Sequence, residues 1–358
     1  MTIKLLLLEG DGIGPEITAA TRAVLTAADA TFGLNLVFET ADIGFNALAT
    51  CGTTIPDAVI AQAKIADGVI LGPVSHNSYP PVNAGGLNPS GVLRKALDLY
   101  ANIRPARTRG GFMGFGGKAV DLVVVRENTE GFYADRNMFM GSGEFMPTPD
   151  VALAVRKVTR EASLRIAASA FELARTRSKR VTVVHKANVL RVSDGLFLSC
   201  VREVAARYPD VTVEERLVDA MAALLVRDAS AFDVILATNM FGDILSDQAA
   251  ELSGSLGLAA SLNAGKMHGV AQAQHGSAPD IAGQDQANPA SLIGSAAMLL
   301  QWLSERRDSP ELLRAARGIE NALDAVIATP SGRTADMGGA LGTHAFAQRV
   351  CEALRQTP

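Results

Sequence analysis

The sequence predicts an α/β protein with a mostly parallel sheet flanked by helices. Short runs of leucine and β-branched residues alternate with longer segments of helical apolar spacing, and this alternation begins at residue 3. Hydrophobic residues form 48% of the 358 residues and aromatic residues only 5%, so small and branched aliphatic side chains would fill the core. Because parallel strands need helical crossovers, the alternation indicates helices on both faces of the sheet.

The first expected element is a buried strand over 4–8, followed by a turn and a helix that Pro15 and Glu16 open. Further strands are expected over 36–39, 68–71, 121–126, 180–184, 212–217 and 233–237. Helices are expected over 56–65, 90–98, 160–176, 194–208, 219–227, 242–253, 288–304, 311–328 and 340–354. The stretch 137–149 breaks this rhythm with methionine and phenylalanine among glycines, which predicts either an irregular core loop or an arm packed against a second subunit.

The charge balance excludes two kinds of partner. With 33 basic and 37 acidic residues the net charge is -4, so the chain has no general cationic field to hold nucleic acid or an anionic membrane. It also lacks a signal-peptide pattern and any apolar run of about 18 residues. Cys51, Cys200 and Cys351 stand far apart and in no CxxC pattern, which is typical of a reducing compartment. We therefore expect a cytoplasmic protein.

A glycine-rich turn, Gly-Asp-Gly-Ile-Gly-Pro at 10–15, lies between the first strand and the first helix. The dinucleotide fingerprint GxGxxG requires a third glycine where this chain has Pro15, so the turn does not predict a standard Rossmann fold. The helix N-terminus could still receive an anion or a ribose. The alternative is a simple turn without a ligand.

Three carboxylates are candidates for a metal site. Asp243 and Asp247 are four residues apart near a predicted helix start, hence on one face, where like charges repel by about 0.2–0.5 kcal/mol and favour a cation between them. Asp219, just after a strand, could supply a third carboxylate. Carboxylates without Cys or His suit Mg²⁺ or Mn²⁺ rather than zinc. The alternative is that first-turn acids merely complement the helix dipole.

Basic and phenolic side chains follow predicted elements in a similar way. Arg94, Arg104 and Arg126 lie at element ends and, if they share one site, would clamp a di- or tricarboxylate through paired hydrogen bonds. Singly, each is more often a surface ion pair. Lys186, after a buried strand, could act as a base near neutral pH, and Tyr133 as the matching acid. Without that context they would be a snorkelling lysine and a packed tyrosine.

Six motifs follow one another through nearly the whole chain. They are GDGIGPE at 10–16, LRKALDLYANIRP at 93–105, VVVRENTEGFY at 123–133, VHKANVL at 184–190, TNMFGDILSD at 238–247, and HGSAPDIAG at 275–283 with ANP at 287–289. Together they resemble the β-decarboxylating dehydrogenase family, which contains isocitrate, homoisocitrate, 3-isopropylmalate, tartrate and D-malate dehydrogenases. The resemblance implies a two-domain isocitrate/isopropylmalate dehydrogenase-like fold, distinct from the Rossmann fold.

The resemblance also implies a division of the chain and an obligate homodimer. A large, cofactor-binding domain would comprise 1–99 and 253–358, and a small domain, 100–252, would carry the dimer interface with 137–149 as its arm. The active sites would be shared between the subunits. The residues that would reach into the neighbour's cleft are Lys186, Asn188 and Asp219.

By the same resemblance, the reaction is the metal-dependent, NAD-linked oxidative decarboxylation of a 3-substituted (2R)-malate. The three arginines named above would clamp the malate carboxylates, and the three aspartates would hold Mg²⁺ or Mn²⁺. Lys186 would assist removal of the hydroxyl proton as hydride leaves for NAD. The metal-polarised ketone would accept electrons as CO₂ departs, and Tyr133 would protonate the enolate carbon.

The loop that begins at His275 carries the implied cofactor preference. Members that prefer NAD have an acid at the position of Asp280, beside Ile281 and Ala287, because a carboxylate accepts hydrogen bonds from ribose hydroxyls and repels a 2′-phosphate. Gln272 replaces a glutamate that in many members contacts the nicotinamide ribose, and it keeps hydrogen bonding without the charge. The other implied cofactor contacts are Ile13, Asn188, His275, Gly276, Ser277, Ala278 and Asn288.

Asn88 and Ser90, ahead of Arg94, would read the group on C3 of the substrate. This polar pair could bind a third carboxylate. An isopropyl group would leave the two polar side chains without hydrogen-bond partners, at a cost of about 1–3 kcal/mol, so isocitrate or homoisocitrate is favoured. Val92 and Leu93 could instead build an apolar wall, as in the 3-isopropylmalate dehydrogenase of leucine biosynthesis. A tartrate or D-malate dehydrogenase, a regulatory isocitrate dehydrogenase subunit, and a sugar- or nucleotide-binding module are further alternatives.

Overall fold

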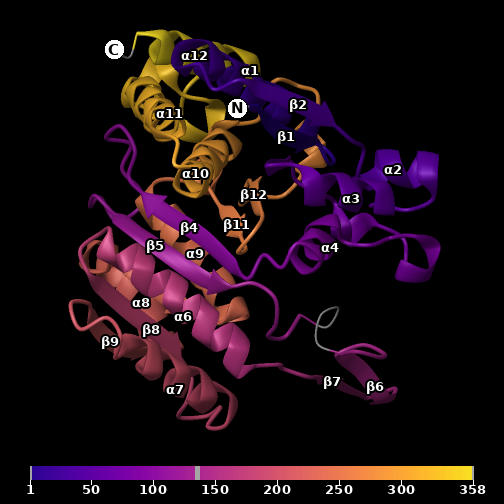
Figure 1. Cartoon of the computed structure of the whole chain (residues 1–358), viewed down its shortest axis with the longest axis vertical. Helices are drawn as coiled ribbons and strands as arrows, with labels where there is room; N and C mark the ends of the chain where they lie inside the picture. Colours follow the sequence, from indigo (N-terminus) through magenta and orange to yellow (C-terminus); the bar gives the residue numbers. More distant parts are fainter. Residues whose placement is uncertain (1, 134–137, 357–358) are drawn as a thin grey trace. The chain divides into compact units, whose positions relative to one another are not determined.

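The computed structural model describes residues 2–133 and 138–356, and the chain divides into two compact units (Figure 1). The first unit comprises Met1–Leu97, Thr108–Met113 and Gly254–Pro358, and the second comprises Asp98–Arg107 and Gly114–Ser253. The sequence-based division differs mainly in the segment Thr108–Met113. This segment belongs to the first unit because the buried Arg109 pairs there with Glu320 (2.8 Å) and Asp324 (3.1 Å).

The sheet of the first unit has the strand order β2-β1-β3-β12-β11. Its strands are β1 (Ile3–Leu8), β2 (Leu36–Thr40), β3 (Gly68–Leu71), β11 (Leu262–Ala264) and β12 (Gly269–Gln272). Strand β1 runs parallel to β2 and β3, and β12 runs parallel to β3 and antiparallel to β11. Two segments far apart in the sequence therefore build one sheet.

Helices bury this sheet. The long ones are α1 (Gly14–Phe32), α10 (Ala290–Arg307), α11 (Pro310–Ala328) and α12 (Thr343–Arg355), and the shorter ones are α2 (Gly44–Cys51), α3 (Asp57–Ile65) and α4 (Pro89–Ala96). Leu5 of β1, Leu25 of α1 and Leu299 of α10 lie in one buried cluster. The core thus joins the first strand and helix of the chain to its C-terminal helices.

The second unit has the strand order β4-β5-β10-β8-β9. Its strands are β4 (Ala101–Arg107), β5 (Asp121–Glu127), β8 (Arg180–His185), β9 (Thr212–Leu217) and β10 (Val234–Ala237). Strand β10 is parallel to β5 and β8, β8 is parallel to β9, and β4 is antiparallel to β5. The predicted fold class, a mostly parallel sheet flanked by helices, is confirmed.

In the second unit, two helices pack on each face of the strands. Val123 and Val125 of β5 pack with α6 (Arg160–Arg175) and α7 (Ser193–Ala205), whereas Leu122 and Val124 pack with α8 (Val218–Asp228) and α9 (Asn239–Ser253). Successive residues of a strand point to opposite faces, so a valine-rich run is the pattern of a strand buried on both sides.

The structure corrects two predicted elements near the candidate site. Arg104 lies inside β4 and not at an element end, because β4 continues through Pro105 in its antiparallel pairing with β5. Helix α9 begins at Asn239, three residues before the predicted start, so Asp243 lies beyond the first turn and its first turn holds no acid. The helix-dipole interpretation of Asp243 and Asp247 therefore fails.

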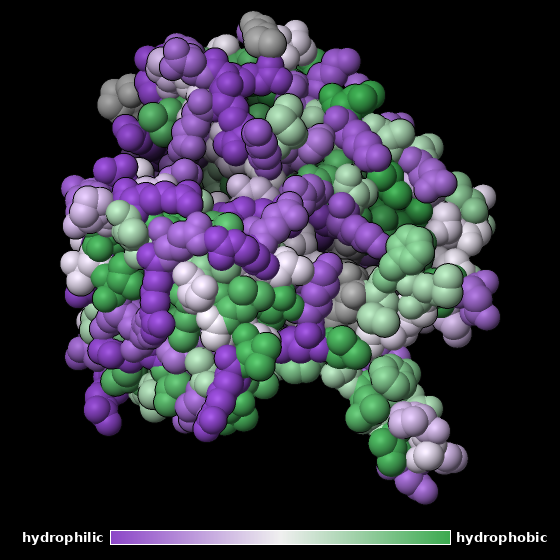
Figure 2. Space-filling view, turned by 60° about the horizontal axis from the view of Figure 1, so that its bottom comes forward, coloured by the Kyte–Doolittle hydropathy of each residue, from purple (hydrophilic) through white to green (hydrophobic). Residues whose placement is uncertain are grey.

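An antiparallel hairpin, β6 (Glu144–Thr148) and β7 (Val151–Ala154), stands exposed along both strands. Large apolar side chains of this segment, Phe139, Met140, Phe145 and Met146, lie open on the surface (Figure 2). The core-loop alternative is therefore wrong for 138–149, while residue 137 lies outside the described residues. The arm alternative stays a prediction.

Candidate active site

Side chains from β4, β5 and α9 converge in the second unit, where α9 packs on both strands. Arg104 comes from β4, Arg126 from β5, and Asp243 and Asp247 from one face of α9. Gly242 allows the close approach, because a Cβ at this position would lie 2.8 Å from the Arg126 side chain. The structure thus brings together two predicted substrate residues and two predicted metal ligands.

Arg104 lies between the two aspartates of α9. Its Nη1 is 3.1 Å from Asp243 Oδ1 and 3.1 Å from Asp247 Oδ1. The cation expected between these two like charges is therefore the guanidinium group of Arg104. Burial, followed by the neighbouring Arg126 charge, lowers the pKa of Arg104 to about 10. The repulsion between the aspartates is therefore offset within the chain, and it does not by itself require a metal ion.

Tyr133 is hydrogen-bonded into the same cluster, which we call the arginine–aspartate cluster: Arg104, Arg126, Tyr133, Asp243 and Asp247. The Tyr133 hydroxyl donates to Asp243 Oδ2 (2.7 Å) and accepts from Arg126 Nη2 (2.6 Å). Arg126 also contacts Asp243 Oδ1 and donates to Asn239 Oδ1 from Nε (3.0 Å) and Nη2 (2.8 Å). A phenol between a cation and a carboxylate can give up and regain a proton, as the predicted acid role of Tyr133 requires.

Lys186 and Asp219 form a separate pair at the ends of β8 and β9. The Lys186 ammonium contacts Asp219 Oδ1 and lowers the pKa of that carboxyl group. The strand end is held by the buried Asp194, which accepts from the Lys186 N–H (2.5 Å) and pairs with Arg156. Among the described residues, no three His, Cys, Asp or Glu side chains gather into a group that could hold a metal ion, so Asp219 does not join Asp243 and Asp247 within one chain.

In the first unit, helix α4 carries the residues expected to read the substrate. Asn88 caps this helix, because its Oδ1 accepts from the Gly91 N–H (3.2 Å). Ser90 Oγ donates to Gln272 Oε1 (3.1 Å), and Arg94 Nη2 lies 3.5 Å from the same oxygen. The amide oxygen of Gln272, expected to face the cofactor, therefore contacts the substrate helix.

The glycine-rich turn and the loop after β12 are joined through their backbones. The Ile13 N–H donates to Ser277 O (2.8 Å), and a Cβ on Gly12 would lie 2.0 Å from the same oxygen. Gly12 has φ +58, so both space and backbone conformation favour glycine there. Ser75 Oγ is 2.7 Å from Ser277 Oγ and adds a side-chain contact. The turn is built into a second loop rather than being an isolated connection.

His275 is half-buried: its Nδ1 lies 2.9 Å from Gly276 O, its Nε2 makes no hydrogen bond to a described residue, and desolvation lowers its pKa. A neutral imidazole with a buried nitrogen that lacks a hydrogen bond fits a planar nucleotide group.

The other predicted cofactor residues differ in exposure. Asp280 and Asn188 are exposed, Ile281 and Ala278 are half-buried, and Ala287 is buried. Asn288 is engaged structurally, donating to Asp336 (3.0 Å) and accepting from the Ala290 N–H (3.0 Å).

Comparisons with known proteins bear on what these sites do. The family model described as "Isocitrate/isopropylmalate dehydrogenase" matches residues 4–354. The chain belongs to the isocitrate/isopropylmalate dehydrogenase family. It is 41% identical to the "Isocitrate/homoisocitrate dehydrogenase" of Thermus thermophilus and 38% identical to the "3-isopropylmalate/3-methylmalate dehydrogenase" of Methanocaldococcus jannaschii, with 99% of both chains covered in each case.

A solved structure supports the same family assignment. The isocitrate dehydrogenase from Methylococcus capsulatus matches with a TM-score of 0.87 and 39% identity, over 99% of this chain and all of that one. Chains of this isocitrate/isopropylmalate dehydrogenase family are NAD(P)-dependent dehydrogenases of hydroxy acids that use a divalent metal ion. The resemblance stated from the six motifs is therefore confirmed.

Sequence reasoning missed Asp11, which organises the glycine-rich turn of this dehydrogenase. Asp11 is buried, and its two oxygens accept from the N–H groups of Phe45 (2.8 Å) and Ser75 (2.8 Å) and from the Tyr79 hydroxyl. Burial and Asp11 together raise the pKa of Tyr79. An aspartate in a glycine-rich turn is usually solvated, so only its partners, 34 to 68 residues away, distinguish this one.

Replacing Asp11 by alanine should destabilise the first unit by about 2–3 kcal/mol, because two backbone N–H groups and the phenol of Tyr79 lose the buried acceptor that they share. Thermal unfolding followed by circular dichroism would measure the loss. The exposed Asp57 at the start of α3 provides the control, since its replacement by alanine should cost about 1 kcal/mol or less. Equal stability of the Asp11 variant and the natural chain would contradict this role.

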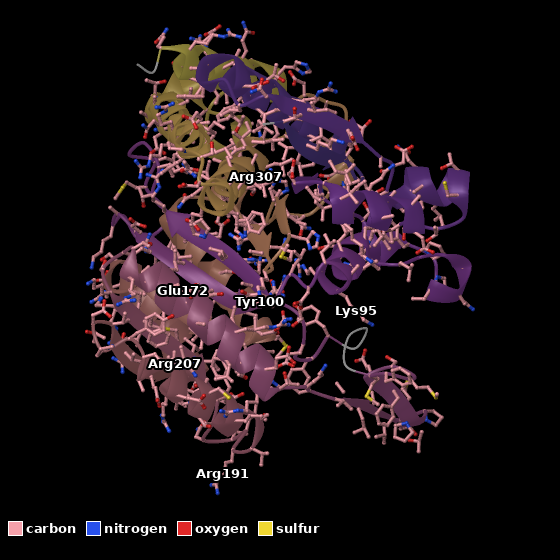
Figure 3. All side chains as sticks on the ribbon, in the orientation of Figure 1. Lys95, Tyr100, Glu172, Arg191, Arg207 and Arg307 are labelled. Carbon is pink, nitrogen blue, oxygen red and sulfur yellow. The ribbon has the colours of Figure 1, made fainter. Side chains whose placement is uncertain are left out.

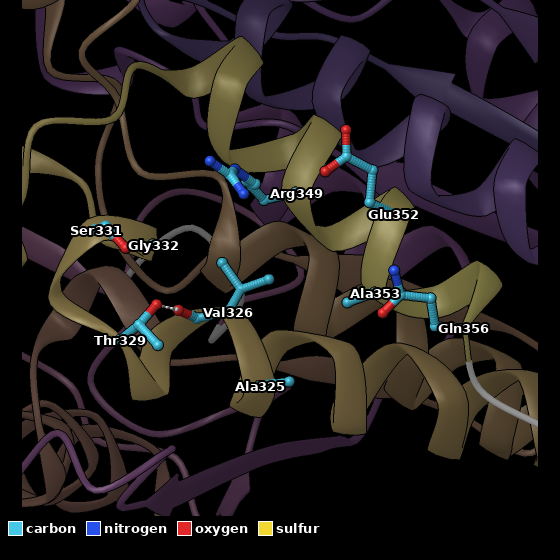
Figure 4. Close-up of a pocket in the computed structure, with 9 residues that line it drawn as sticks. All are labelled: Ala325, Val326, Thr329, Ser331, Gly332, Arg349, Glu352, Ala353 and Gln356. Atoms are coloured by element: carbon cyan, nitrogen blue, oxygen red, sulfur yellow. Dashed lines mark hydrogen bonds between the residues drawn. The ribbon is translucent and has the colours of Figure 1, made fainter.

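Two further findings concern the described part of the dehydrogenase. A cavity of about 210 Å³ lies against α11 and α12, between Val326, Thr329, Arg349, Glu352 and Gln356 (Figure 4). It contains none of the residues predicted to bind substrate, metal or cofactor.

No described helix combines the length and the apolar character that a membrane crossing would need.

Proposed function

We propose that this chain is a catalytic subunit that performs the NAD-linked, metal-dependent oxidative decarboxylation of a 3-substituted (2R)-malate, with isocitrate or homoisocitrate as the favoured substrate. The observation that carries the proposal is the arginine–aspartate cluster, in which two guanidinium groups, two carboxylates and a phenol meet where α9 packs on β4 and β5. A regulatory subunit would have no need of this arrangement. The names of the Thermus and Methylococcus relatives favour isocitrate-type substrates.

In the proposed reaction, Arg104 and Arg126 bind substrate carboxylates, because buried guanidinium groups form short, charge-assisted hydrogen bonds. Asp243 and Asp247 would hold Mg²⁺ or Mn²⁺ together with Asp219 of a second subunit, as hard oxygen ligands suit these ions. When bound, the metal would polarise the oxygen at C2 and NAD would supply the hydride acceptor. Lys186 takes the proton of the C2 hydroxyl group.

Tyr133 completes the sequence of proton transfers. After CO₂ departs, the electron pair of the broken carbon–carbon bond is held in an enolate, whose carbon must be protonated. The Tyr133 hydroxyl can supply this proton, because Arg126 at 2.6 Å stabilises the phenolate that remains. Asp243, at 2.7 Å, orients the hydroxyl before the transfer.

We propose NAD rather than NADP as the acceptor. Asp280 is exposed in the loop that packs on the glycine-rich turn, where its carboxylate would meet the ribose hydroxyls and repel a 2′-phosphate. Ile13, Gly276, Ser277 and Ala278 would form the backbone surface under the nucleotide. His275, kept neutral by desolvation, would lie beside its ring.

We further propose that the protein acts as a homodimer with shared active sites. Lys186 and Asp219 pair with one another and not with the arginine–aspartate cluster, so a second copy must supply them if three carboxylates are to meet. The residues that follow Lys186 are exposed and could contact a second subunit. Asn188, Val189 and Val192 are exposed, and the last two are apolar. The side chain of Arg191 points away from the ribbon (Figure 3). The free cysteines favour a reducing, cytoplasmic setting.

The exposed hairpin predicts how the dimer is held. Changing both Phe145 and Leu153, which face each other across β6 and β7, to glutamate should convert the protein to monomers and abolish activity. Sedimentation velocity would measure the assembly. A double change of Glu144 and Ala154 to lysine, on the neighbouring register pair, tests charge without removing large apolar groups. A dimer that survives the first change would contradict the arm interpretation.

An alternative substrate is 3-isopropylmalate, and one observation favours it. Asn88 caps α4 and Ser90 donates to Gln272, so both polar groups have protein partners and neither must face a carboxylate. The name of the Methanocaldococcus relative is in keeping with this alternative. A polar pair satisfied within the protein weakens the penalty for an apolar C3 group.

The deciding experiment is NADH formation with Mn²⁺, comparing isocitrate, homoisocitrate, 3-isopropylmalate, D-malate and tartrate by kcat/KM, and repeated with NADP. We expect a tricarboxylate and NAD to lead by about tenfold or more, which corresponds to about 1.4 kcal/mol. A lead of 3-isopropylmalate would replace the favoured substrate by the alternative. Turnover of none of the five acids with either cofactor would refute the proposed catalytic role.

A further inference from the structure

Gln272 ends β12 and has its main chain fixed on both sides. Its N–H donates to Ser261 O (3.2 Å), and its carbonyl oxygen accepts from the hydroxyl groups of Ser261 (2.8 Å) and Ser295 (3.0 Å). Because the backbone is held in this way, the side chain leaves the sheet from a rigid position. Its direction then depends on the partners of the amide group.

Three donors converge on the amide oxygen of Gln272. Ser90 Oγ lies at 3.1 Å, Asn263 Nδ2 at 3.2 Å and Arg94 Nη2 at 3.5 Å. A guanidinium nitrogen can only donate, so the oxygen of the amide, and not its nitrogen, must face α4. Ser90 and Arg94 are four residues apart and lie one above the other on this helix, which lets a single oxygen serve both.

The neutrality of this amide matters for Arg94. An amide oxygen binds a guanidinium through its dipole and leaves the positive charge in place. A carboxylate at the same position would form an ion pair with Arg94 and would compete with an incoming anion. It would also hold the Ser90 hydroxyl more strongly, since charge-assisted hydrogen bonds are about twice as strong as neutral ones.

We propose that Gln272 is a positioning residue for the substrate: its amide oxygen orients Ser90 and Arg94 and, being uncharged, adds no carboxylate that would compete with the substrate for Arg94. The inference rests on the proposed function and on the role that the resemblance implies for Arg94, which is to bind such a carboxylate. It assigns the side chain to the substrate, whereas the sequence places Gln272 among the cofactor contacts. Replacement by glutamate should then impair substrate binding more than cofactor binding.

The test compares Gln272→Glu with Gln301→Glu, which adds the same charge at an exposed position of α10. The probe is the acid with the highest kcat/KM in the panel above, titrated calorimetrically with Mn²⁺ and without NAD. We expect Gln272→Glu to raise the Kd of this acid about tenfold, with the KM for NAD changed less than about twofold. Gln301→Glu should behave as the natural chain, and the melting temperatures of all three should agree.

A second measurement separates positioning from a general loss of structure. Gln272→Ala and Ser90→Ala are combined in a double-mutant cycle on the same Kd, and their effects should be clearly less than additive because one contact is lost twice. An unchanged Kd in Gln272→Glu, a change confined to the KM for NAD, or full additivity would each overturn the positioning role. If the natural chain turns over and binds none of the five acids, the proposed function falls and this inference falls with it.

Discussion

Co-production of two inactive variants, Lys186→Met and Asp243→Asn, should restore about a quarter of the natural activity, provided that the chains pair at random. In the proposed dimer each site combines the arginine–aspartate cluster of one chain with Lys186 and Asp219 of its partner. A mixed dimer then has one site with both changes and one site with neither. About half of the dimers are mixed, and each has one of its two sites intact.

The measurement uses two affinity tags, so that mixed dimers can be isolated and assayed directly. A matched pair, Tyr133→Phe with Asp243→Asn, provides the control, because both residues belong to one cluster and every site in the mixed dimer carries one change. This second mixture should stay inactive. Activity in neither mixture would mean that Lys186 acts within its own chain, and the shared-site proposal would be abandoned.

Changing Arg126 to methionine should lower kcat/KM by about a thousandfold, which is about 4 kcal/mol of transition-state stabilisation. Arg126 is almost fully buried and holds Asn239, Asp243 and the Tyr133 hydroxyl, so its loss removes both a substrate contact and the cation beside the acid. Arg126→Lys keeps the charge but loses the planar fork, and we expect an intermediate loss.

Thermal unfolding separates chemistry from folding in this series. Because Arg126→Met leaves Asp243 without one of its cations, some loss of stability is expected, and activity should be compared at a temperature where each variant is folded. A reduction below about tenfold in Arg126→Met would show that Arg126 is not a main contact of the substrate carboxylates. Arg104→Met would then become the variant of larger effect.

Much of the fold could be predicted because its signals are local. A few consecutive residues are enough to identify the valine-rich runs at 123–125 and 181–184 and the glycine-rich turn. Strand β4 was missed, since Pro105 normally ends an element and the pairing that tolerates it comes from β5. Helix α2 and strands β11 and β12 were missed as well, because short elements of three to eight residues carry too little periodicity.

The candidate site was predictable as a list of residues, and much less as a set of contacts. Arginines, aspartates, Tyr133 and Lys186 stand in motifs that a resemblance can identify. The position of Arg104 between Asp243 and Asp247, however, joins residues about 140 apart, and the contact of Ser90 with Gln272 spans 182 residues. No spacing rule reaches that far, so the partners of these side chains become visible only in three dimensions.

The position of Arg104 between the two aspartates has a thermodynamic consequence. A substrate anion that binds alone must draw the guanidinium groups away from their carboxylates. A metal cation that binds alone must draw the carboxylates away from the guanidinium groups. When both arrive together, one set of ion pairs is exchanged for another and no charge is left unpaired. Linkage then requires that each ligand tighten the binding of the other by the same factor. We therefore expect the acid and the metal ion to bind as a pair, each weak without its companion.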